Sequence, residues 1–442
     1  MRDSLDKSAH SDAAANRMRG QVRADGLHLA GKKSRISFYL VLAYLLLEYG
    51  RPQTYLPFLS KLHLPAITII LLALYLFVSD KMLLIQKQTI LILILLGIMV
   101  IHGPFAVNNY WALIIFITMS MNFIALLSLV QFVDNPEIYD RLVKIWLGIH
   151  IFLAVIGIVN KGTGIGGFLG DENDFCMTLN MIIPFPFFLS LYASGKEKIY
   201  YILLTCLFLF VIILTESRGG FVGLSATLIY CLFKTKRKAI TALIVGLLAV
   251  FAVLVAPSNY WKEVRSITEE GTSSGTGEER IYTWRIGWHM FLDNPIIGVG
   301  QGNFPWEFQK YEYEVTGSDE PFYGRSVAGR AAHSVYFTLL PELGLIGTFL
   351  FVLMVYYNIR NLNVVKKISL NHKNININKN QIPNPGDQIS RFYYIALALE
   401  GSMVSYLVSG AFISTLYYPN FWVLTGFILS VKNIATSQCN NF

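Results

Sequence analysis

Long apolar runs, separated by short polar connections, make up most of this chain of 442 residues. A bilayer core about 30 Å thick is crossed by about 20 mostly apolar helical residues. The runs lack the strict alternation of barrel strands, so the backbone polar groups must be satisfied within helices. The pattern predicts an all-α polytopic membrane protein with about twelve spans, at 36–50, 62–79, 88–103, 110–132, 142–160, 174–194, 199–215, 219–233, 239–256, 333–358, 392–414 and 417–431.

One long polar stretch, Pro257 to Ala332, interrupts this pattern and predicts a single large loop outside the membrane. Within it, apolar and aromatic residues at Ile281, Trp284, Trp288 and Phe291 recur at helical spacing. Such spacing favours an amphipathic helix that lies in the membrane interface. Because tryptophan collects at headgroup level, we expect Trp284 and Trp288 to anchor this helix there.

The remaining segments complete the predicted organisation. The first 35 residues are polar, basic and poor in aromatics, which is typical of a disordered tail; no cleavable secretory pattern follows them. An Asn-rich stretch ending in Pro383-Asn-Pro-Gly386 predicts a flexible cytoplasmic linker. The expected units are a tail (1–35), helices one to nine (36–256), an outer loop (257–332), helix ten (333–360), a linker (361–391), and helices eleven and twelve with a C-terminal tail (392–442).

The distribution of Lys and Arg predicts the orientation. The chain is 54% hydrophobic and 14% charged, with a formal net charge of +8. If the N-terminus is cytoplasmic, inside segments collect the basic residues of the tail and of 81–87, 141–144, 196–198, 234–238, 360–391 and Lys432. The outer connections then hold only Arg51, Lys61 and Lys161, with Arg218 at a span end. The positive-inside rule therefore predicts cytoplasmic termini and an outer loop, and no nucleic-acid partner is needed to explain the charge.

Metal and nucleotide chemistry find little support in the sequence. The four cysteines form no CxxC pair, and neither HExxH nor a cluster of histidines with carboxylates occurs. Gly298-Val-Gly-Gln-Gly302 is similar to a dinucleotide loop, but no predicted strand precedes it. We therefore expect a tight turn there, and neither a metal nor a cofactor.

Two arginine positions are candidates for binding an anion. Arg218 ends a span in Thr215-Glu-Ser-Arg-Gly-Gly220, where it serves either as a snorkelling partner of Glu216 or as a fixed cation for phosphate. In the second case, the two following glycines would let a ligand approach the backbone. Arg280 and Arg285 lie on the predicted loop helix, where Glu278 and Glu279 would balance a merely solvated cationic face.

His333 is the best candidate for acid–base work because it titrates near neutrality and stands where the loop re-enters the membrane. The alternative is a polar residue that caps the start of the span. Tyr336 shares roughly its helical face. Glu342 and Glu400 are intramembrane carboxylates, which mark either a functional site or partners for an inward-facing arginine.

These residues stand in an ordered series of motifs. They are Ser217-Arg218-Gly219, Arg280-x3-Trp284, Pro295-Ile-Ile-Gly-Val-Gly-Gln-Gly-Asn-Phe304, His333-Ser-Val-Tyr336, Glu342-Leu-Gly-Leu-Ile-Gly347 and the earlier Asp171-Glu-Asn-Asp174. In order, spacing and common side of the membrane, the series resembles the O-antigen ligase and O-antigen polymerase superfamily of bacterial envelope glycosyltransferases. It covers about 165–350, and Ser334 departs from it, standing where Asn is common.

The resemblance implies a GT-C-like enzyme of the bacterial inner membrane that moves a glycan from undecaprenyl diphosphate to an acceptor hydroxyl on the periplasmic face. It implies catalytic roles for His333, Arg280 and Arg218. It also implies substrate-binding roles for a further set of residues, namely Arg285, Tyr336, Glu342, Asn173 and Trp284. Transfer would be inverting and independent of metal, with His333 activating the acceptor and the arginines stabilising the leaving diphosphate.

Several functions remain open at this point. A ligase would use lipid A-core as acceptor, a polymerase another lipid-linked repeat, and an oligosaccharyltransferase a protein hydroxyl. A single large loop directly before the His333 span favours the ligase. A transporter or flippase would instead use Glu400 and Arg218 along a translocation path, and a scaffold would leave the motif residues apart. Convergence of Arg218, Arg280 and His333 at the outer end of the bundle distinguishes the enzyme from both.

Overall fold

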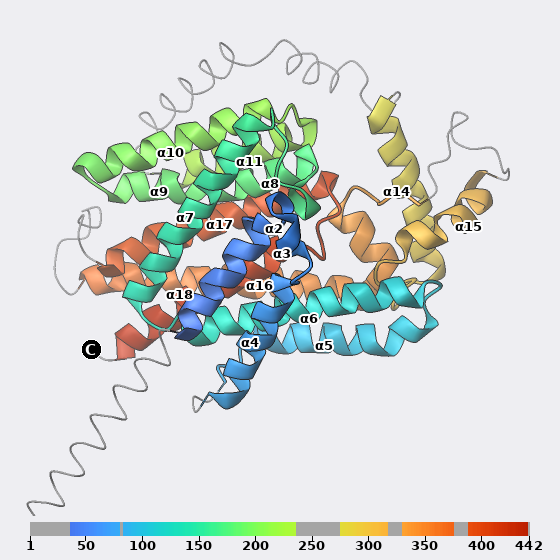
Figure 1. Ribbon diagram of the computed structural model, residues 1–442, viewed down its shortest axis with the longest axis horizontal. Coiled ribbons are helices and arrows are strands. Elements are labelled where there is room, and N and C mark those ends of the chain that lie inside the picture. The colour runs from blue at the N-terminus through green and yellow to red at the C-terminus, as the bar shows by residue number, and fades with distance from the viewer. Residues whose placement is uncertain (1–35, 80–82, 236–274, 317–328, 375–387, 441–442) are drawn as a thin grey trace, which may run out of the picture.

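The computed structural model describes residues 36–79, 83–235, 275–316, 329–374 and 388–440. Most of these residues are helical, and no strand occurs among them. The protein is thus an all-α polytopic membrane protein, as the apolar pattern predicts. Figure 1 shows the helices as a bundle whose members run roughly alongside one another.

The first helix, Ile36–Tyr49, is apolar but short. The labelled helices of the first half are α2 (Pro52–Tyr55), α3 (Pro57–Ser60), α4 (Leu64–Val78), α5 (Lys87–His102), η1 (Gly103–Phe105), α6 (Asn109–Phe132), α7 (Pro136–Val159), η2 (Gly167–Leu169), α8 (Glu172–Ile182), α9 (Pro184–Tyr192), α10 (Gly195–Leu214) and α11 (Arg218–Lys234). Those of the second half are α14 (Gly275–Asp293), α15 (Phe304–Thr316), α16 (Val335–Asn374), α17 (Gln388–Ser409), η4 (Gly410–Phe412) and α18 (Pro419–Asn440).

The predicted spans coincide with these helices wherever the chain is described. Among the described residues, eight helices are long and apolar enough to cross a membrane, and α8 with α9 forms one of them. The spans predicted at 36–50, 219–233 and 417–431 are helical as Ile36–Tyr49, α11 and α18. The span predicted at 239–256 and the tail 1–35 lie outside the described residues. The predicted start of the linker at 361 is wrong, because α16 continues to Asn374.

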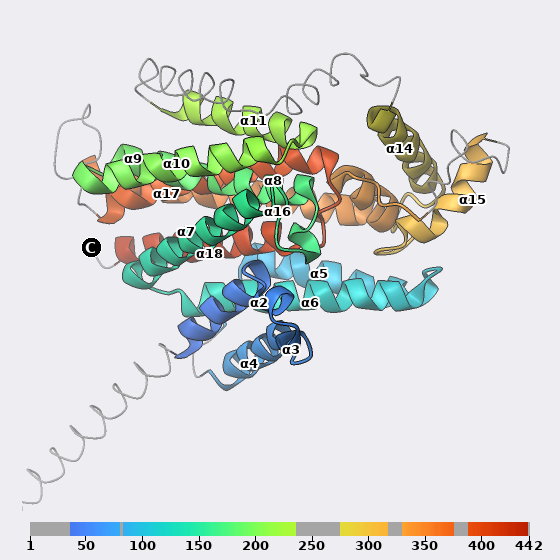
Figure 2. The same cartoon turned by 45° about the horizontal axis from the view of Figure 1, so that its top comes forward.

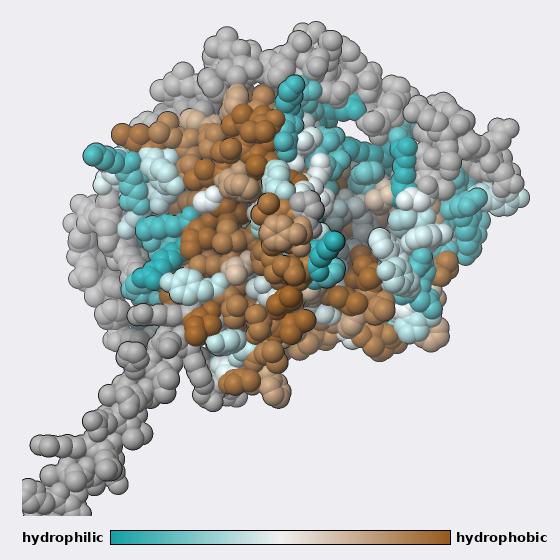
Figure 3. Space-filling model, viewed as in Figure 1, coloured by the Kyte–Doolittle hydropathy of each residue, from teal (hydrophilic) through white to brown (hydrophobic). Residues whose placement is uncertain are grey.

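The bundle has a buried centre and an exposed edge. In the span formed by α8 and α9, 89% of the apolar window is buried, and in that of Ser390–Phe412 67% is buried. The window of Phe58–Val78, which contains α4, is only 17% buried, so this helix stands at the edge. On the face shown in Figure 3, hydrophobic residues form a broad band between hydrophilic ends, the surface expected of a chain that spans a bilayer.

Small polar side chains connect the central helices. Asn180 on α8 donates through Nδ2 to the carbonyl of Gly220 on α11 at 2.9 Å. Thr227 on α11 and Ser405 on α17 share a hydrogen bond of 2.6 Å between their hydroxyl oxygens. Such bonds hold helices together where lipid supplies no hydrophobic driving force. Two walls of the site described below, carried by α8 and α11, are therefore fixed by the bundle core.

The helix α16 is broken where the polar loop docks on it. Pro341 and Gly344 interrupt its hydrogen bonding, and Gly344 has φ 61° and ψ −162°. The freed backbone groups pair with the loop: Val299 N–H donates to the Pro341 carbonyl at 2.8 Å and Leu345 N–H to the Pro295 carbonyl at 2.8 Å. A break at membrane depth is tolerated where other backbone satisfies it. The break thus anchors the loop to the bundle.

The loop helices have a small core of their own at one end of the bundle (Figures 1 and 2). Ile286 and Met290 of α14 pack with Phe304, Phe308 and Tyr311, which begin and line α15. Of the predicted stripe, Phe291 is buried, Ile281 and Trp284 are half-buried and Trp288 is exposed. The face of α14 that packs against α15 and α16 thus lies beside the stripe, and the interfacial position of the stripe stays a prediction.

Ion pairs hold helices together away from this loop. Glu400 on α17 pairs with Lys234 at the end of α11, at 2.9 Å, and with Lys366 far along α16. Arg391 near the start of α17 pairs with Asp140 near the start of α7. Lys234 lies at the opposite end of α11 from Arg218. Glu400 therefore serves as a structural partner for lysines and is separated from Arg218 by the length of that helix.

Candidate active site

The first wall of the site is the connection between α7 and α8. Asp171 caps α8, since its side chain accepts a hydrogen bond from the Asn173 N–H at 2.8 Å. Its Oδ1 also accepts from Asn173 Nδ2 at 3.0 Å. The sequence folds this way because an aspartate at this position satisfies an N–H that the helix leaves unpaired. The predicted site residue Asn173 is thereby held in a fixed orientation.

The second wall is the start of α11. Ser217 caps this helix by accepting from the Gly220 N–H at 2.9 Å, and its hydroxyl donates to Asn173 Oδ1 at 2.7 Å. The motifs Asp171–Asp174 and Ser217–Gly219, distant in sequence, are thus joined by one hydrogen bond. Arg218 is the first residue of α11 and stands at the positive end of its dipole.

The glycines after Arg218 have a packing role. A side chain at Gly220 would place Cβ 2.1 Å from Cys176 Sγ, and one at Gly219 would lie 3.0 Å from Phe412 Cβ. These glycines let α11 cross α8 and η4 closely. The expectation that they admit a ligand to the backbone is therefore wrong, because protein atoms already occupy that space.

A cleft of about 630 Å³ opens between these walls and α14. This volume lies within the range of small-molecule sites. Its charged lining residues are Lys161, Glu172, Glu216, Arg218 and Arg280. Arg218 and Arg280, predicted separately from two motifs, therefore border the same cleft.

Electrostatics confirms how close the two arginines lie. Burial lowers the pKa of Arg280, and the guanidinium of Arg218 lowers it further, while Asp171 opposes both effects. Two cations that disfavour each other's charge are usual in sites where an anion is to bind between them. The arrangement at this cleft thus suits an anionic group.

His333 belongs to the same constellation. It precedes α16 with φ 48°, a left-handed conformation that is uncommon for a residue with a side chain. Its pKa is lowered from the usual value, first by partial burial and then by Arg280, with Asp171 acting in the opposite direction. A lowered pKa keeps the imidazole neutral at physiological pH, so it can accept a proton.

Trp284 links Arg280 to His333. It lies one turn after Arg280 on α14, and its Nε1–H donates to the Ala332 carbonyl at 2.9 Å. Its ring stacks on Phe337 of α16 at 5.0 Å between centroids, with an interplanar angle of 2°. The Trp284 indole thus contacts the chain before His333, at Ala332, and after it, at Phe337. Trp284 therefore positions the chain around His333, and its expected place at headgroup level stays a prediction.

Other predicted site residues lie outside the cleft. Arg285 is exposed on α14 and is absent from the cleft lining. The Tyr336 hydroxyl donates to the Leu407 carbonyl of α17 at 2.7 Å, which commits it to helix packing. Neither position supports the expected contact with substrate.

Glu342 has a structural role that its motif did not reveal. Its side chain is 2% exposed and accepts from the Gly302 N–H at 2.7 Å, the Phe304 N–H at 3.0 Å and the Tyr417 hydroxyl at 2.6 Å. Its acceptor positions are used by the protein itself, so the predicted substrate contact is not supported. The carboxylate instead fastens the end of the Gly298–Phe304 turn to α16.

The Gly298–Phe304 segment is a tight turn, as predicted, and not a nucleotide-binding loop. Gly298 has φ 74°, and a Cβ there would lie 2.4 Å from the Glu342 carbonyl carbon. Gln301 Nε2 donates to the Met99 carbonyl at 3.0 Å, and Asn303 Oδ1 accepts from the Asn108 N–H at 2.8 Å. The turn thereby joins α16 to α5 and α6. Because it follows α14 closely in the chain, it also fixes the position of the C-terminal end of α14.

Sequence reasoning did not assign to the site three charged residues that border the cleft, namely Lys161, Glu172 and Glu216. Lys161 and Glu216 carried a weak signal: they are charged residues at outer span ends. Asp171 was noticed as part of a motif but not assigned to the site. Only the folded chain shows it acting on both Arg280 and His333.

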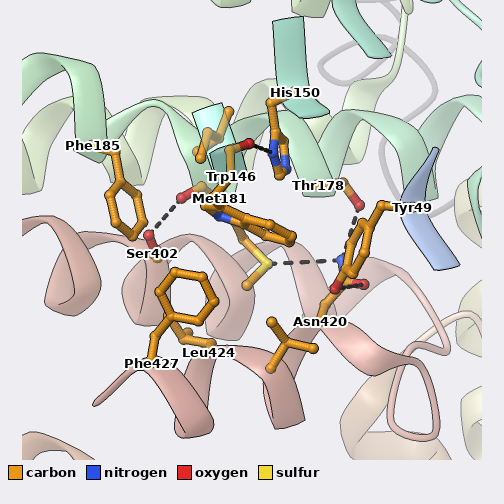
Figure 4. A pocket seen from close by; sticks show the side chains of 12 residues that line it. Tyr49, Trp146, His150, Thr178, Met181, Phe185, Ser402, Asn420, Leu424 and Phe427 are labelled. Atoms are coloured by element: carbon orange, nitrogen blue, oxygen red, sulfur yellow. Dashed lines mark hydrogen bonds between the residues drawn. The ribbon is translucent and has the colours of Figure 1, made fainter. Parts of the chain in front are cut away.

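A second internal cavity, shown in Figure 4, is too small to be a substrate site. Its volume is about 20 Å³, which is room for about one water molecule. It lies among bundle side chains that include Tyr49, Trp146 and Asn420. His150 also borders it, with Nδ1 2.8 Å from the Trp146 carbonyl. Within the described residues, no group of three or more His, Cys, Asp or Glu is placed to hold a metal ion.

Comparison with known proteins agrees with the motif series. Residues 203–352 match the O-antigen ligase family. The matched range contains Arg218, Arg280 and His333. The match supports a place for this part of the chain in the O-antigen ligase and polymerase superfamily.

The chain is also similar to the teichuronic acid biosynthesis protein TuaE of Bacillus subtilis (strain 168), with 26% identity over 235 residues. The match covers 44% of this chain and 48% of the relative, so the chain spans about half the length of the curated relative it matches. The two arginines of the cleft, together with His333 beside Arg280, are the part of the structure that suits an activity on an anionic substrate.

Proposed function

We propose that the protein is a glycosyltransferase that moves a glycan from a lipid diphosphate to an acceptor hydroxyl. The observation that supports this most is that Arg218 and Arg280 line one cleft, while His333, which is not part of the cleft lining, is coupled electrostatically to Arg280 and Asp171. A superfamily match alone would support only the general class. The structure adds to that match two arginines that can bind the donor diphosphate and a histidine that can act as the base.

The two arginines suit the leaving group. As the bond to the anomeric carbon breaks, negative charge grows on the bridging oxygen of the diphosphate. Guanidinium groups remain charged at all working pH values and bind phosphate oxygens in a bidentate manner. Arg218 also adds the positive end of the α11 dipole. Preorganised donors of this kind are each worth about 10²–10³-fold in rate.

His333 suits the acceptor. In the neutral form favoured by its lowered pKa, the imidazole accepts the proton of the attacking hydroxyl. The oxygen attacks the anomeric carbon from the face opposite the departing diphosphate, so the configuration inverts. Retained configuration of the product sugar, detected by NMR, would contradict a single displacement.

The acceptor has two candidates. The match to the O-antigen ligase family favours lipid A-core, reached from the periplasmic face of the inner membrane. The relative that acts in teichuronic acid biosynthesis favours a second candidate, a growing polysaccharide chain. The donor chemistry at the cleft is the same for both, and only the acceptor differs.

The transporter alternative loses its main support. It relied on Glu400 and Arg218 lining one path, but Glu400 pairs with Lys234 and Lys366 at the far end of α11. A scaffold would not require three chemically matched residues to meet. Both alternatives remain outcomes of the test.

The test is in vitro transfer by the purified full chain in lipid nanodiscs with EDTA present. Undecaprenyl diphosphate-linked glycan is the donor, and lipid A-core, a lipid-linked glycan and a Ser/Thr-containing protein are offered separately as acceptors. We expect transfer to one acceptor, lowered about 10²–10³-fold by Arg280→Ala and about 10²–10⁴-fold by His333→Ala.

Arg285→Ala is the matched control, because it removes an arginine from the exposed face of the same helix. Equal losses in Arg280→Ala and Arg285→Ala would argue against the cleft as the donor site. Absence of transfer to every acceptor, with both site variants still supporting growth of a deletion strain, would contradict the proposed function.

A further inference from the structure

Two residues of the cleft wall hold a left-handed backbone conformation although they carry long side chains. Lys161 has φ 54° and Glu216 has φ 51°. Both line the cleft together with Arg218 and Arg280. The mechanism proposed above gives neither of them a role.

Lys161 stands at the C-terminal end of α7, one residue beyond its cap Asn160. Its N–H donates to the Ile158 carbonyl at 3.3 Å, and the Gly162 N–H donates to the Gly157 carbonyl at 2.8 Å. This pair of bonds is the Schellman ending of a helix, and its left-handed position is ordinarily glycine. A lysine there is therefore a departure from the residue that the backbone prefers.

Glu216 departs in the same way at the end of α10. It follows the cap Thr215, and its N–H donates to the Ile213 carbonyl at 3.3 Å. The two helix ends meet, since a Cβ at Gly162 would lie 2.0 Å from the Leu214 carbonyl oxygen. Two adjacent helix ends thus carry a charged side chain at the position where glycine would be free of strain.

Such strain is confined to a few described residues. In the described part of the chain, the non-glycine residues with positive φ are Arg51, His63, Lys161, Glu216 and His333. Lys161 and Glu216 line the cleft, and His333 is the candidate base. Left-handed residues with a side chain destabilise the fold and gather at functional sites.

The charges of the pair suit a ligand with two kinds of group. Neither Lys161 nor Glu216 has an ion-pair partner within the described ranges. A diphosphate alone would favour a lining of cations, and a carboxylate beside it would be repelled. Sugar hydroxyls, in contrast, donate readily to carboxylate oxygens.

We propose that Lys161 and Glu216 are substrate-binding residues, with Lys161 contacting the diphosphate and Glu216 the hydroxyls of the sugar attached to it. The strained conformation is retained because glycine, which would relieve it, has no side chain to offer the ligand. This inference rests on the proposed function. It adds two residues that recognise different parts of the donor, the diphosphate and the first sugar.

The experiment compares the binding of two probes to the full chain in nanodiscs: undecaprenyl diphosphate without sugar, and the glycan-linked form. The variants are Lys161→Gly and Glu216→Gly, each of which also relieves backbone strain. His63→Gly is the matched control, because His63 has φ 45° but precedes α4 away from the cleft lining. Thermal unfolding midpoints are measured for all.

We expect Lys161→Gly to weaken binding of both probes about tenfold or more, as for loss of a hydrogen bond to a charged group. Glu216→Gly should weaken only the glycan-linked probe. All three glycine variants should unfold at the same or a higher temperature than the parent. His63→Gly should bind both probes as the parent does.

Lys161→Arg and Glu216→Gln provide rescue, since each keeps part of the chemistry without relieving the strain. If Lys161→Gly and Glu216→Gly bind both probes as tightly as the parent, these residues serve only the helix ends, and the inference is wrong. If the parent itself binds neither probe and transfers no glycan, the proposed function fails instead. The two failures are therefore distinguishable.

Discussion

At the scale of single residues, the charged side chains of the site shift one another's pKa values. Asp171 acts on both Arg280 and His333, and Arg280 acts on His333 in the opposite sense. The net effect on His333 is a lowered pKa. The guanidinium groups of Arg218 and Arg280 lie beside one cleft. These are the conditions that a base and an anion-binding pair require.

The pH dependence of transfer should follow His333. Only the neutral imidazole accepts a proton, so kcat/KM should rise with pH through a midpoint below the usual value near 6.5, and should be lost as pH falls. Arg280→Gln removes a cation that lowers this pKa, so the midpoint of the residual activity should move to higher pH. Arg285→Gln should leave the midpoint in place; equal shifts in both variants would contradict the assignment.

At the scale of elements, the loop helices are held in register with the bundle by three attachments. They are the break in α16 between Pro341 and Gly344, the Glu342 carboxylate, and the Trp284 indole. Each connects the polar loop to a membrane helix. Together they bring Arg280 to the cleft formed by α8 and α11 and hold His333 where the charge of Arg280 acts on its pKa.

Glu342→Gln should loosen the turn. An amide offers one acceptor oxygen, and its NH₂ group would face backbone N–H donors that now meet a carboxylate. Leaving one such donor unsatisfied destabilises by about 1–3 kcal/mol. We expect a lower thermal unfolding midpoint in detergent. Glu314→Gln, an exposed change on α15, should have no such effect.

Trp284→Phe should separate positioning from stability. Phenylalanine keeps a ring to stack on Phe337 but loses the N–H that binds the Ala332 carbonyl. The loss of one hydrogen bond destabilises by about 0.5–1.5 kcal/mol. Because the bond sets the approach to His333, kcat should fall with little change in KM for the donor. Trp288→Phe, at a residue that is 46% exposed, is the control, and a similar fall in kcat there would argue against positioning.

At the scale of the whole molecule, the two ends of the bundle differ in chemistry. One end carries the cleft and the loop helices, and the other carries the Glu400 and Asp140 ion pairs. An apolar band lies between them on the face shown in Figure 3. This division suits a protein whose substrates reach it from one side of a membrane.

The orientation predicted from Lys and Arg can be tested by labelling. In a Cys439→Ser background, Thr163→Cys at the cleft should react in intact cells with a maleimide that does not cross the inner membrane. Lys367→Cys, toward the far end of α16, should react only after the membrane is opened. Cys176 and Cys231 are buried and should not react with the maleimide. The reverse pattern would invert the topology and place the cleft inside.

The sequence by itself determined the class of fold and most span positions, and it singled out Arg218, Arg280 and His333 as candidates for the site. These follow from local properties: apolar runs of bilayer length and charged side chains at span ends. It could not place the buried face of α14, which depends on partners from α15 and α16. Nor could it show that α16 breaks in order to receive the loop.

The tertiary structure alone decided which residues meet. Glu342 and Tyr336 read as site residues in their motifs, yet their polar atoms are used by Gly302, Tyr417 and Leu407. Lys161 and Glu216 stood in no motif and line the cleft. The reason is physical: a motif specifies the chemistry that a side chain can offer. Which protein groups satisfy that chemistry, and which side chains remain for a ligand, depends on segments far apart in sequence that only folding brings together.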